Sequence, residues 1–148
     1  EFFGVVVEVV DSHGGWINKF EGDAALAVFG APAALDDPAG SALASGREMA
    51  ARLRAEVEDV EAGIGISFGE VVAGNIGAAQ RFEYTVIGDA VNEASRLCDL
   101  AKERGEDLLA SSDAVDASGA DEAERWRRDE EVELRGRSRA TRLALPKE

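Results

Sequence analysis

The stretch "NKFEGDAALAVFG", residues 18–30, decides how the first part of the chain folds. Two short apolar runs, at 16–20 and 24–29, flank the sequence Glu-Gly-Asp at 21–23, and this pattern predicts a β-hairpin. Lys19 lies on the way into the expected turn, and Asp23 lies on the way out. A surface ion pair would explain the two charges, and a functional role for each is the alternative.

Helical and extended patterns follow the hairpin. Asp37 as cap and Pro38 in the first turn predict the start of a helix, and apolar residues at helical spacing extend it to about residue 58. The glycine-rich and β-branched segment 62–77 predicts a strand pair or one bent strand. A short strand at 84–87 leads into a helix that opens at Gly88-Asp89 and runs to about residue 102.

The ends of the chain are less regular. Segment 2–10 fits either a strand, by its valines, or one face of a helix. We expect a strand at 107–110, a short helix and loop at 111–119, a charged solvated segment at 121–131, and a final antiparallel pair from 132–134 and 141–145. Trp126 is either an anchor or a partly buried edge. The whole pattern predicts one α/β domain, an α+β sandwich over residues 1–148, with a sheet on one side and helices on the other.

Composition excludes several classes of function. The 148 residues carry a net charge of −14, which argues against binding nucleic acid or anionic lipid, because both need a basic surface. Cys98 is the single cysteine, so an internal disulfide and a cysteine-based zinc site are excluded. No apolar run is long enough to span a bilayer, so this chain is expected to make no direct membrane contact. A reducing, cytoplasmic setting is the expectation, with attachment of a larger parent protein to the membrane as an alternative.

The helix after Gly88 carries a polar face. Asp89, Asn92 and Arg96 stand at i, i+3 and i+7, so they share that face. Arginine donors suit phosphate oxygens, and an asparagine amide can orient a sugar. A solvated helix face is the alternative for these residues taken alone. Val91, Ala94 and Cys98 are expected to pack on the sheet from the opposite side.

Two motifs together identify a family. "NKFEGDAALAVFG" followed by "YTVIGDAVNEASRL" at 84–97 closely resembles the catalytic domain of class III adenylate and guanylate cyclases, of the bacterial adenylate cyclase type. "GISFGEVVAGNIG" at 65–77 and "VELRGRSRATRLALP" at 132–146 support the resemblance, which covers essentially the whole chain. It implies a ferredoxin-like βαββαβ core with extra C-terminal antiparallel strands. It also implies a head-to-tail homodimer with active sites between the two domains.

The resemblance implies a role for each matching residue. Asp23 corresponds to a ligand of two Mg²⁺ or Mn²⁺ ions, and Lys19 with Thr85 corresponds to the pair that reads the purine base. Asn92 matches the residue that orients the ribose, and Arg96 matches the arginine that stabilises charge at the α-phosphorus. In the family pattern, Asp23 serves one active site of the dimer while the other four complete the second site. The implied reaction converts ATP to 3′,5′-cyclic AMP and pyrophosphate.

Lys19 favours ATP over GTP. A lysine donates to a ring nitrogen of adenine, and the hydroxyl of Thr85 can accept from the adenine amino group. Guanine presents the reverse pattern, and guanylate-forming members usually place an acidic residue where Lys19 stands. Guanylate cyclase and a catalytically inactive regulatory or dimerisation module are the alternatives.

The family's other metal-binding aspartate lies on a first strand, followed by a phosphate-binding turn and a helix. We expect these elements before residue 1, so that the first strand and helix are missing here and the chain as given lacks cyclase activity. Regulatory segments are also expected outside this window. For "RGRSR", residues 135–139, a solvated hairpin turn is the default interpretation and phosphate contact the alternative.

Overall fold

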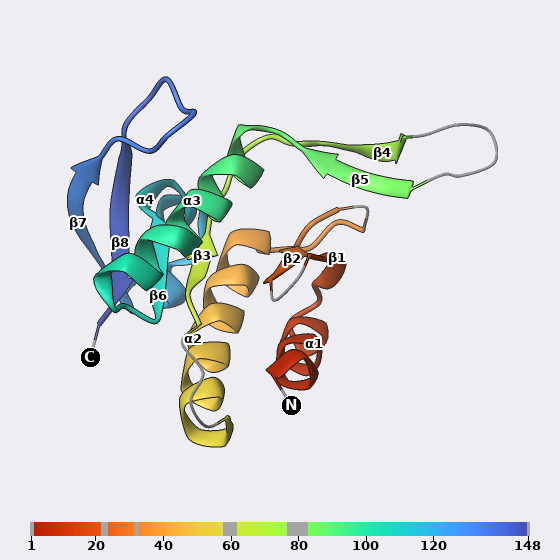
Figure 1. The fold of residues 1–148 in the computed structure, drawn as a ribbon, viewed down its shortest axis with the longest axis horizontal. Helices are drawn as coiled ribbons and strands as arrows, with labels where there is room; N and C mark the ends of the chain where they lie inside the picture. Colours follow the sequence, from red (N-terminus) through yellow and green to blue (C-terminus); the bar gives the residue numbers. More distant parts are fainter. Residues whose placement is uncertain (1, 22–23, 32, 58–61, 77–82, 148) are drawn as a thin grey trace.

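The largest sheet of the domain has four strands. The structure, a computed structural model, describes residues 2–21, 24–31, 33–57, 62–76 and 83–147 (Figure 1). The strands β3 (Ile64–Ile66), β6 (Leu108–Ser111), β8 (Thr141–Pro146) and β7 (Trp126–Val132) form it in that order. β3 and β6 are parallel, and the other pairs are antiparallel. This mixed sheet agrees with the predicted α+β class.

Helices pack on both faces of this sheet. α2 (Pro38–Glu56) and α4 (Ser112–Ala117) share a core with it around Leu43, Leu108 and Val115. α3 (Asp89–Arg104) packs on the other face, where Leu97 and Leu109 meet. The expectation of helices on one side only is therefore wrong, because successive residues of β6 are buried against opposite layers.

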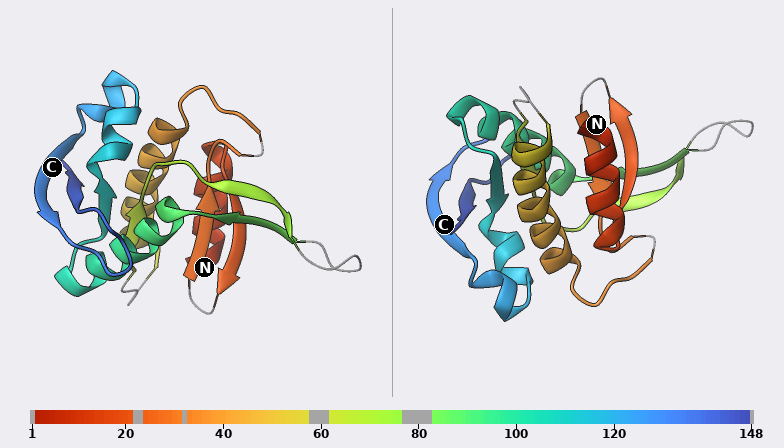
Figure 2. Two further views of the ribbon diagram at one scale, coloured as in Figure 1. Left: turned by 90° about the horizontal axis from the view of Figure 1, so that it is seen from above. Right: turned by 90° about the horizontal axis from the view of Figure 1, so that it is seen from below.

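The ambiguous N-terminal segment is a helix, α1 (Phe2–Ser12). Of its five valines, Val5, Val6, Val9 and Val10 form one buried stripe that packs against α2, whereas Val7 is exposed. The predicted hairpin is confirmed as β1 (Trp16–Glu21) and β2 (Ala24–Val28), which lie alongside α1 (Figure 2). Burial of the valines on one helical face outweighs their preference for strands.

A long antiparallel pair, β4 (Val72–Ile76) and β5 (Glu83–Ile87), extends away from the rest of the domain (Figure 1). The segment 62–77 therefore contributes to two different sheets, since β3 pairs with β6 and β4 pairs with β5. β5 runs directly into α3, so the arm is connected to the helix that carries Asn92 and Arg96.

The charged segment 121–131 is the main error of the sequence prediction. It forms the end of α5 (Ala120–Ala123) and most of β7, so the final antiparallel pair begins at Trp126 rather than at 132. Trp126 is an anchor: it is only 2% exposed, and its indole N–H donates to Glu122 at 2.8 Å. The charged residues made this strand look like a solvated loop in the sequence, because β7 is at the sheet edge, where most side chains face water.

α3 approaches β3 closely at Gly65. A Cβ on Gly65 would lie 2.5 Å from the backbone nitrogen of Cys98, so only glycine allows this contact. The buried residues of α3 are Glu93, Leu97 and Ala101, whereas the predicted packing face of Val91, Ala94 and Cys98 is half-buried. Ala94 and Cys98 do lie against β3, as predicted, because both contact the strand at Gly65 and the thiol of Cys98 donates to the carbonyl oxygen of Gly63. The sequence analysis did not predict that the buried face would include the carboxylate of Glu93.

The close approach at Gly65 yields a stability prediction. Gly65→Ala should lower the free energy of unfolding by about 1–3 kcal/mol, because the added methyl group has no space between strand and helix. Gly4→Ala is the matched control: a Cβ there meets nothing within 4 Å, and alanine favours the helix. Urea unfolding of both variants is the measurement. A Gly65→Ala protein as stable as the wild type would contradict the packing described.

Candidate active site

The helix that carries the predicted site residues begins at a strained turn. Gly88 ends the β5 connection with φ 150°, a conformation that favours glycine. A Cβ there would also lie 3.1 Å from the carbonyl oxygen of Glu70. Gly88 lacks a side chain to cap α3, so the first turn of the helix has no side-chain N-cap.

Asn92 and Arg96 lie on the outer part of α3, as predicted. Asn92 is exposed, and the side chain of Arg96 is 40% exposed. The Arg96 Nε donates to the carbonyl oxygen of Arg135 at 3.3 Å, and its Nη1 lies 3.9 Å from the carboxylate of Asp99 on the same helix. The guanidinium therefore faces the β7–β8 connection and remains accessible to a ligand.

Lys19 and Thr85 lie on neighbouring strands. Lys19 is exposed on β1, opposite Leu26 and next to a register shift, and β1 contacts β5. Thr85 is paired with Gly74 in the arm, and its side chain is not described. Asp23 lies outside the described residues. β1 thus contacts β5, and β5 leads directly into α3, so the three elements that carry Lys19, Thr85, Asn92 and Arg96 are adjacent. The roles of the five residues remain predictions.

The described residues do not form a metal site by themselves. They contain no group of three or more histidine, cysteine, aspartate or glutamate side chains that could hold an ion. A carboxylate such as Asp23 is chemically suited to Mg²⁺ or Mn²⁺, but one ligand does not make a site. We therefore derive no reaction step through a metal from this geometry.

A buried polar network that the sequence does not predict lies on the inner side of α3, beneath Asn92 and Arg96. Glu93 is 3% exposed, and its carboxylate accepts hydrogen bonds from Ser67 and, at 2.6 Å, from Thr141. The guanidinium of Arg137, itself 3% exposed, forms an ion pair with Glu93 at 2.7 Å. All these partners lie more than 20 residues from Glu93 in the sequence, so no local pattern signals the network.

Arg137 also binds the first residue of α3. Its Nη2 donates to Asp89 at 2.7 Å and its Nε at 3.0 Å. The hydrogen bonds from Arg137 hold the pKa of Asp89 below its ordinary value, and those to Asp89 raise the pKa of Arg137. One guanidinium therefore contacts two carboxylates of α3, an exposed one and a buried one.

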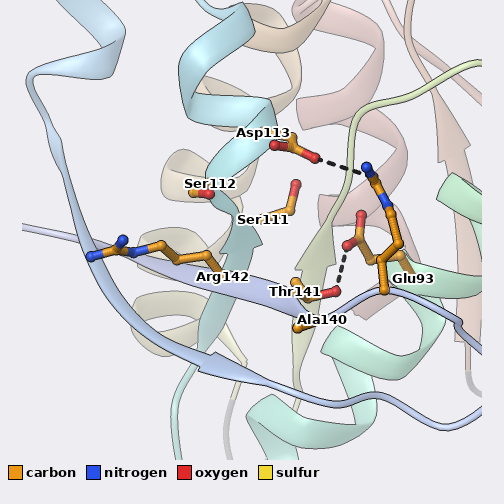
Figure 3. Close-up of a pocket in the computed structure, with 8 residues that line it drawn as sticks. Glu93, Ser111, Ser112, Asp113, Ala140, Thr141 and Arg142 are labelled. Atoms are coloured by element: carbon orange, nitrogen blue, oxygen red, sulfur yellow. Dashed lines mark hydrogen bonds and ion pairs between the residues drawn. The ribbon is translucent and has the colours of Figure 1, made fainter.

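A small polar cavity adjoins this network. Its volume is about 140 Å³, and Figure 3 shows Glu93, Thr141, Ser111 and Asp113 around it. The complete lining is Glu93, Ser111, Ser112, Asp113, Arg139, Ala140, Thr141 and Arg142. Hydroxyl groups and charged groups of both signs dominate the lining. Such a lining is typical of a hydrated cavity rather than of an apolar ligand pocket.

Comparison with known proteins identifies the family. The family model described as the adenylate and guanylate cyclase catalytic domain matches residues 2–146. An uncharacterized protein of Mycobacterium tuberculosis is 56% identical over 145 residues, which are 98% of this chain and 27% of that protein. The chain belongs to the class III adenylate and guanylate cyclase catalytic domain family.

Solved structures agree with this assignment. The guanylyl cyclase Cya2 is 31% identical with a TM-score of 0.77, covering 97% of this chain and 75% of that one. The adenylyl cyclase CyaB from P. aeruginosa is 25% identical with a TM-score of 0.77, covering 99% and 79%. The ferredoxin-like cyclase fold is confirmed, and the neighbours include both nucleotide specificities. Cyclase domains of this family generally use divalent metal ions and work as dimers on a nucleotide substrate.

The chain spans about a quarter of the length of the curated relatives that it matches: 27% of the M. tuberculosis protein. In the described part of the chain, no helix is both long and apolar enough to cross a membrane.

The lowered pKa of Asp89 predicts a pH-dependent contribution to stability. Because folding depresses this pKa, the stabilisation is present above the unfolded pKa, about 3.9, and is lost as pH falls through the folded pKa. Asp89→Asn should therefore be less stable than the wild type near neutral pH, and the difference should shrink below about pH 4. Urea unfolding across this range is the measurement.

Asp121→Asn, at an exposed position of α5, serves as the control and should change the free energy of unfolding by less than about 0.5 kcal/mol. A stability deficit of Asp89→Asn that stays constant down to pH 2 would rule out the Asp89–Arg137 pair as its source.

Proposed function

We propose that the full-length protein containing this chain is an adenylate cyclase that converts ATP to 3′,5′-cyclic AMP and pyrophosphate. The observation that carries the proposal is the accessible pair Asn92 and Arg96 on one side of α3, directly after the strand that bears Thr85. Family membership supports the reaction class, and Lys19 supports ATP as the substrate. The cytoplasm is the proposed compartment.

In the proposed reaction, the ribose 3′-oxygen attacks the α-phosphorus, loses its proton, and pyrophosphate leaves. Asn92 orients the ribose by amide hydrogen bonds. Arg96 donates to the oxygens on which negative charge increases, so it binds the transition state better than the substrate. When bound, two Mg²⁺ or Mn²⁺ ions, with Asp23 as one ligand, would supply activation of the attacking hydroxyl and charge neutralisation on the triphosphate.

Base selection rests on Lys19 in this proposal. The ammonium group is a donor only, so it complements the ring nitrogen acceptor of adenine and opposes the N–H of guanine. Thr85 can both donate and accept, and it adds less discrimination. Guanylate cyclase remains the second candidate, favoured by the 31% identity to the guanylyl cyclase Cya2.

We further propose a head-to-tail homodimer with shared sites. Apolar side chains at the base of the arm support it: Val72 is 66% exposed, and its cross-strand neighbour Ile87 is 50% exposed. Phe68 and Phe20 add exposed aromatic area, at 43% and 48%. A cross-strand pair of exposed apolar side chains, such as Val72 and Ile87, is typical of a surface that another protein covers.

The first test combines loss of activity with rescue. In the full-length protein with Mn²⁺ and ATP, Arg96→Ala should lower kcat about 100- to 1,000-fold, as expected for loss of one transition-state donor. Asp23→Ala should be equally impaired. A 1:1 mixture of the two inactive variants should recover about a quarter of wild-type activity, because half of the dimers are mixed and each has one intact site.

Arg104→Ala is the matched control, since Arg104 lies at the other end of α3 in a surface pair with Glu130. It should retain wild-type activity. A wild-type protein that turns over neither ATP nor GTP would overturn the proposed enzyme. Full activity of Arg96→Ala would remove its catalytic role, and absence of rescue in the mixture would exclude sites shared between subunits.

The second test addresses the base. Lys19→Glu should lower kcat/KM for ATP relative to GTP by about 10- to 100-fold, the effect of one hydrogen bond to a charged group. Competing turnover of ATP and GTP is the measurement. Lys102→Glu makes the same change at an exposed position of α3 and should leave the ratio unaltered. An unchanged ratio in Lys19→Glu would show that other residues select the base.

A further inference from the structure

The buried carboxylate of Glu93 lies in the part of α3 that carries the proposed catalytic residues. Glu93 follows Asn92 directly and precedes Arg96 by three positions. Its two carboxylate oxygens accept from Ser67, just after β3, and from Thr141, the first residue of β8. The same carboxylate is paired with Arg137 at 2.7 Å. Three separate segments thus meet on one side chain of α3.

In the first half of α3, Ala90 and Ala94 lie close to Gly69 and Gly65, and Glu93 is the residue whose side chain is buried. The buried apolar residues of α3, Leu97 and Ala101, lie in the second half, where they join the core around Leu109. The helix begins at Gly88 without a side-chain cap. The polar network therefore fixes the rotation of the segment that presents Asn92 and Arg96.

Arg137 acts on this segment at two points one helical turn apart. Its guanidinium pairs with Glu93 on the buried side and with Asp89 on the exposed side. These two carboxylates stand at i and i+4, so a rigid planar guanidinium that binds both also sets the orientation of the turn between them. Arg135, two residues earlier in the same loop, accepts a hydrogen bond from Arg96 at 3.3 Å.

We propose that Arg137 is a positioning residue for the cyclase reaction: by holding Glu93 and Asp89, it aims Asn92 and Arg96 at the substrate. The inference rests on the proposed function. Arg137 does not itself bind substrate in this account, because its side chain is 3% exposed and its donors are occupied by two carboxylates and Thr141.

A purely structural ion pair makes different predictions. Such a pair contributes to stability alone, and its removal lowers the amount of folded enzyme without changing the properties of the molecules that remain folded. A positioning residue instead lowers kcat, because displacement of Arg96 by about 1 Å weakens contacts that matter in the transition state. The two roles are therefore separable by kinetics on folded protein.

The kinetic experiment uses full-length protein with Mn²⁺ and ATP. In Arg137→Met, kcat should fall about 10- to 100-fold while KM changes less than about threefold. Arg137→Lys keeps the charge and should recover part of the loss. Arg128→Met is the control, since in the described part of the chain Arg128 lies on the edge strand β7 and forms an exposed pair with Asp116.

A double-mutant cycle tests whether Arg137 affects kcat through Arg96. In an Arg96→Ala background, Arg137→Met should have less than about a twofold further effect on kcat, because the group that it positions is already absent. Multiplicative effects would overturn the proposal, as would wild-type kcat in Arg137→Met. If Arg137→Met does not fold, the variant Glu93→Gln/Arg137→Met removes both charges, leaves no unpaired buried carboxylate, and takes its place.

Hydrogen exchange keeps this inference distinct from the proposed enzyme. Backbone amides of residues 89–97 should exchange faster in Arg137→Met than in the wild type, while amides of the buried strand β6 are unchanged. Equal exchange in α3, or a uniform increase over the whole domain, would refute the positioning role. A wild type without turnover of ATP or GTP overturns the cyclase proposal and with it the catalytic role of Arg137, whereas the exchange result still decides whether Arg137 holds α3.

Discussion

One buried carboxylate organises the functional side of this domain. Glu93 is removed from water on the inner face of α3, and a buried charge is tolerated only when partners replace its hydration. Those partners come from the end of β3, the start of β8 and the β7–β8 loop. Satisfying this one group therefore fixes α3 against two strands and a loop at once.

Close packing of α3 on β3 also limits the position of the helix. Gly65 allows the backbone of α3 to lie against β3, so the helix cannot move toward the sheet without a clash. The polar network limits rotation at the first half, and apolar contacts of Leu97 and Ala101 secure the second half. Asn92 and Arg96 are thus displayed on a rigid element, which is the arrangement that precise binding of a ligand requires.

Local sequence signals were sufficient for much of the fold. The cap at Asp37 was readable because its carboxylate accepts from Gly40, three residues away, and Pro38 fits the first turn. The hairpin at β1–β2 was readable because its turn residues separate two apolar runs. The burial of Glu93 could not be predicted, because it depends on Arg137 and Thr141, which are 44 and 48 residues away in the sequence. Strand β7 was not predicted, because the exposed charged residues of an edge strand form the same sequence pattern as a loop.

The two arginines near α3 differ in whether their charge is neutralised by the protein, and this difference matters for an anionic substrate because the protein is acidic. The net charge is −14, so a nucleoside triphosphate is repelled unless positively charged side chains remain available near the site. Arg137 is neutralised by Glu93 and Asp89 and has no capacity left for phosphate. Arg96 is 40% exposed, and in the described part of the chain its ion pair is a 3.9 Å contact with Asp99, so its guanidinium remains available beside Asn92. The buried pair thus supplies rigidity, and the exposed guanidinium, in the proposed reaction, supplies the electrostatic attraction.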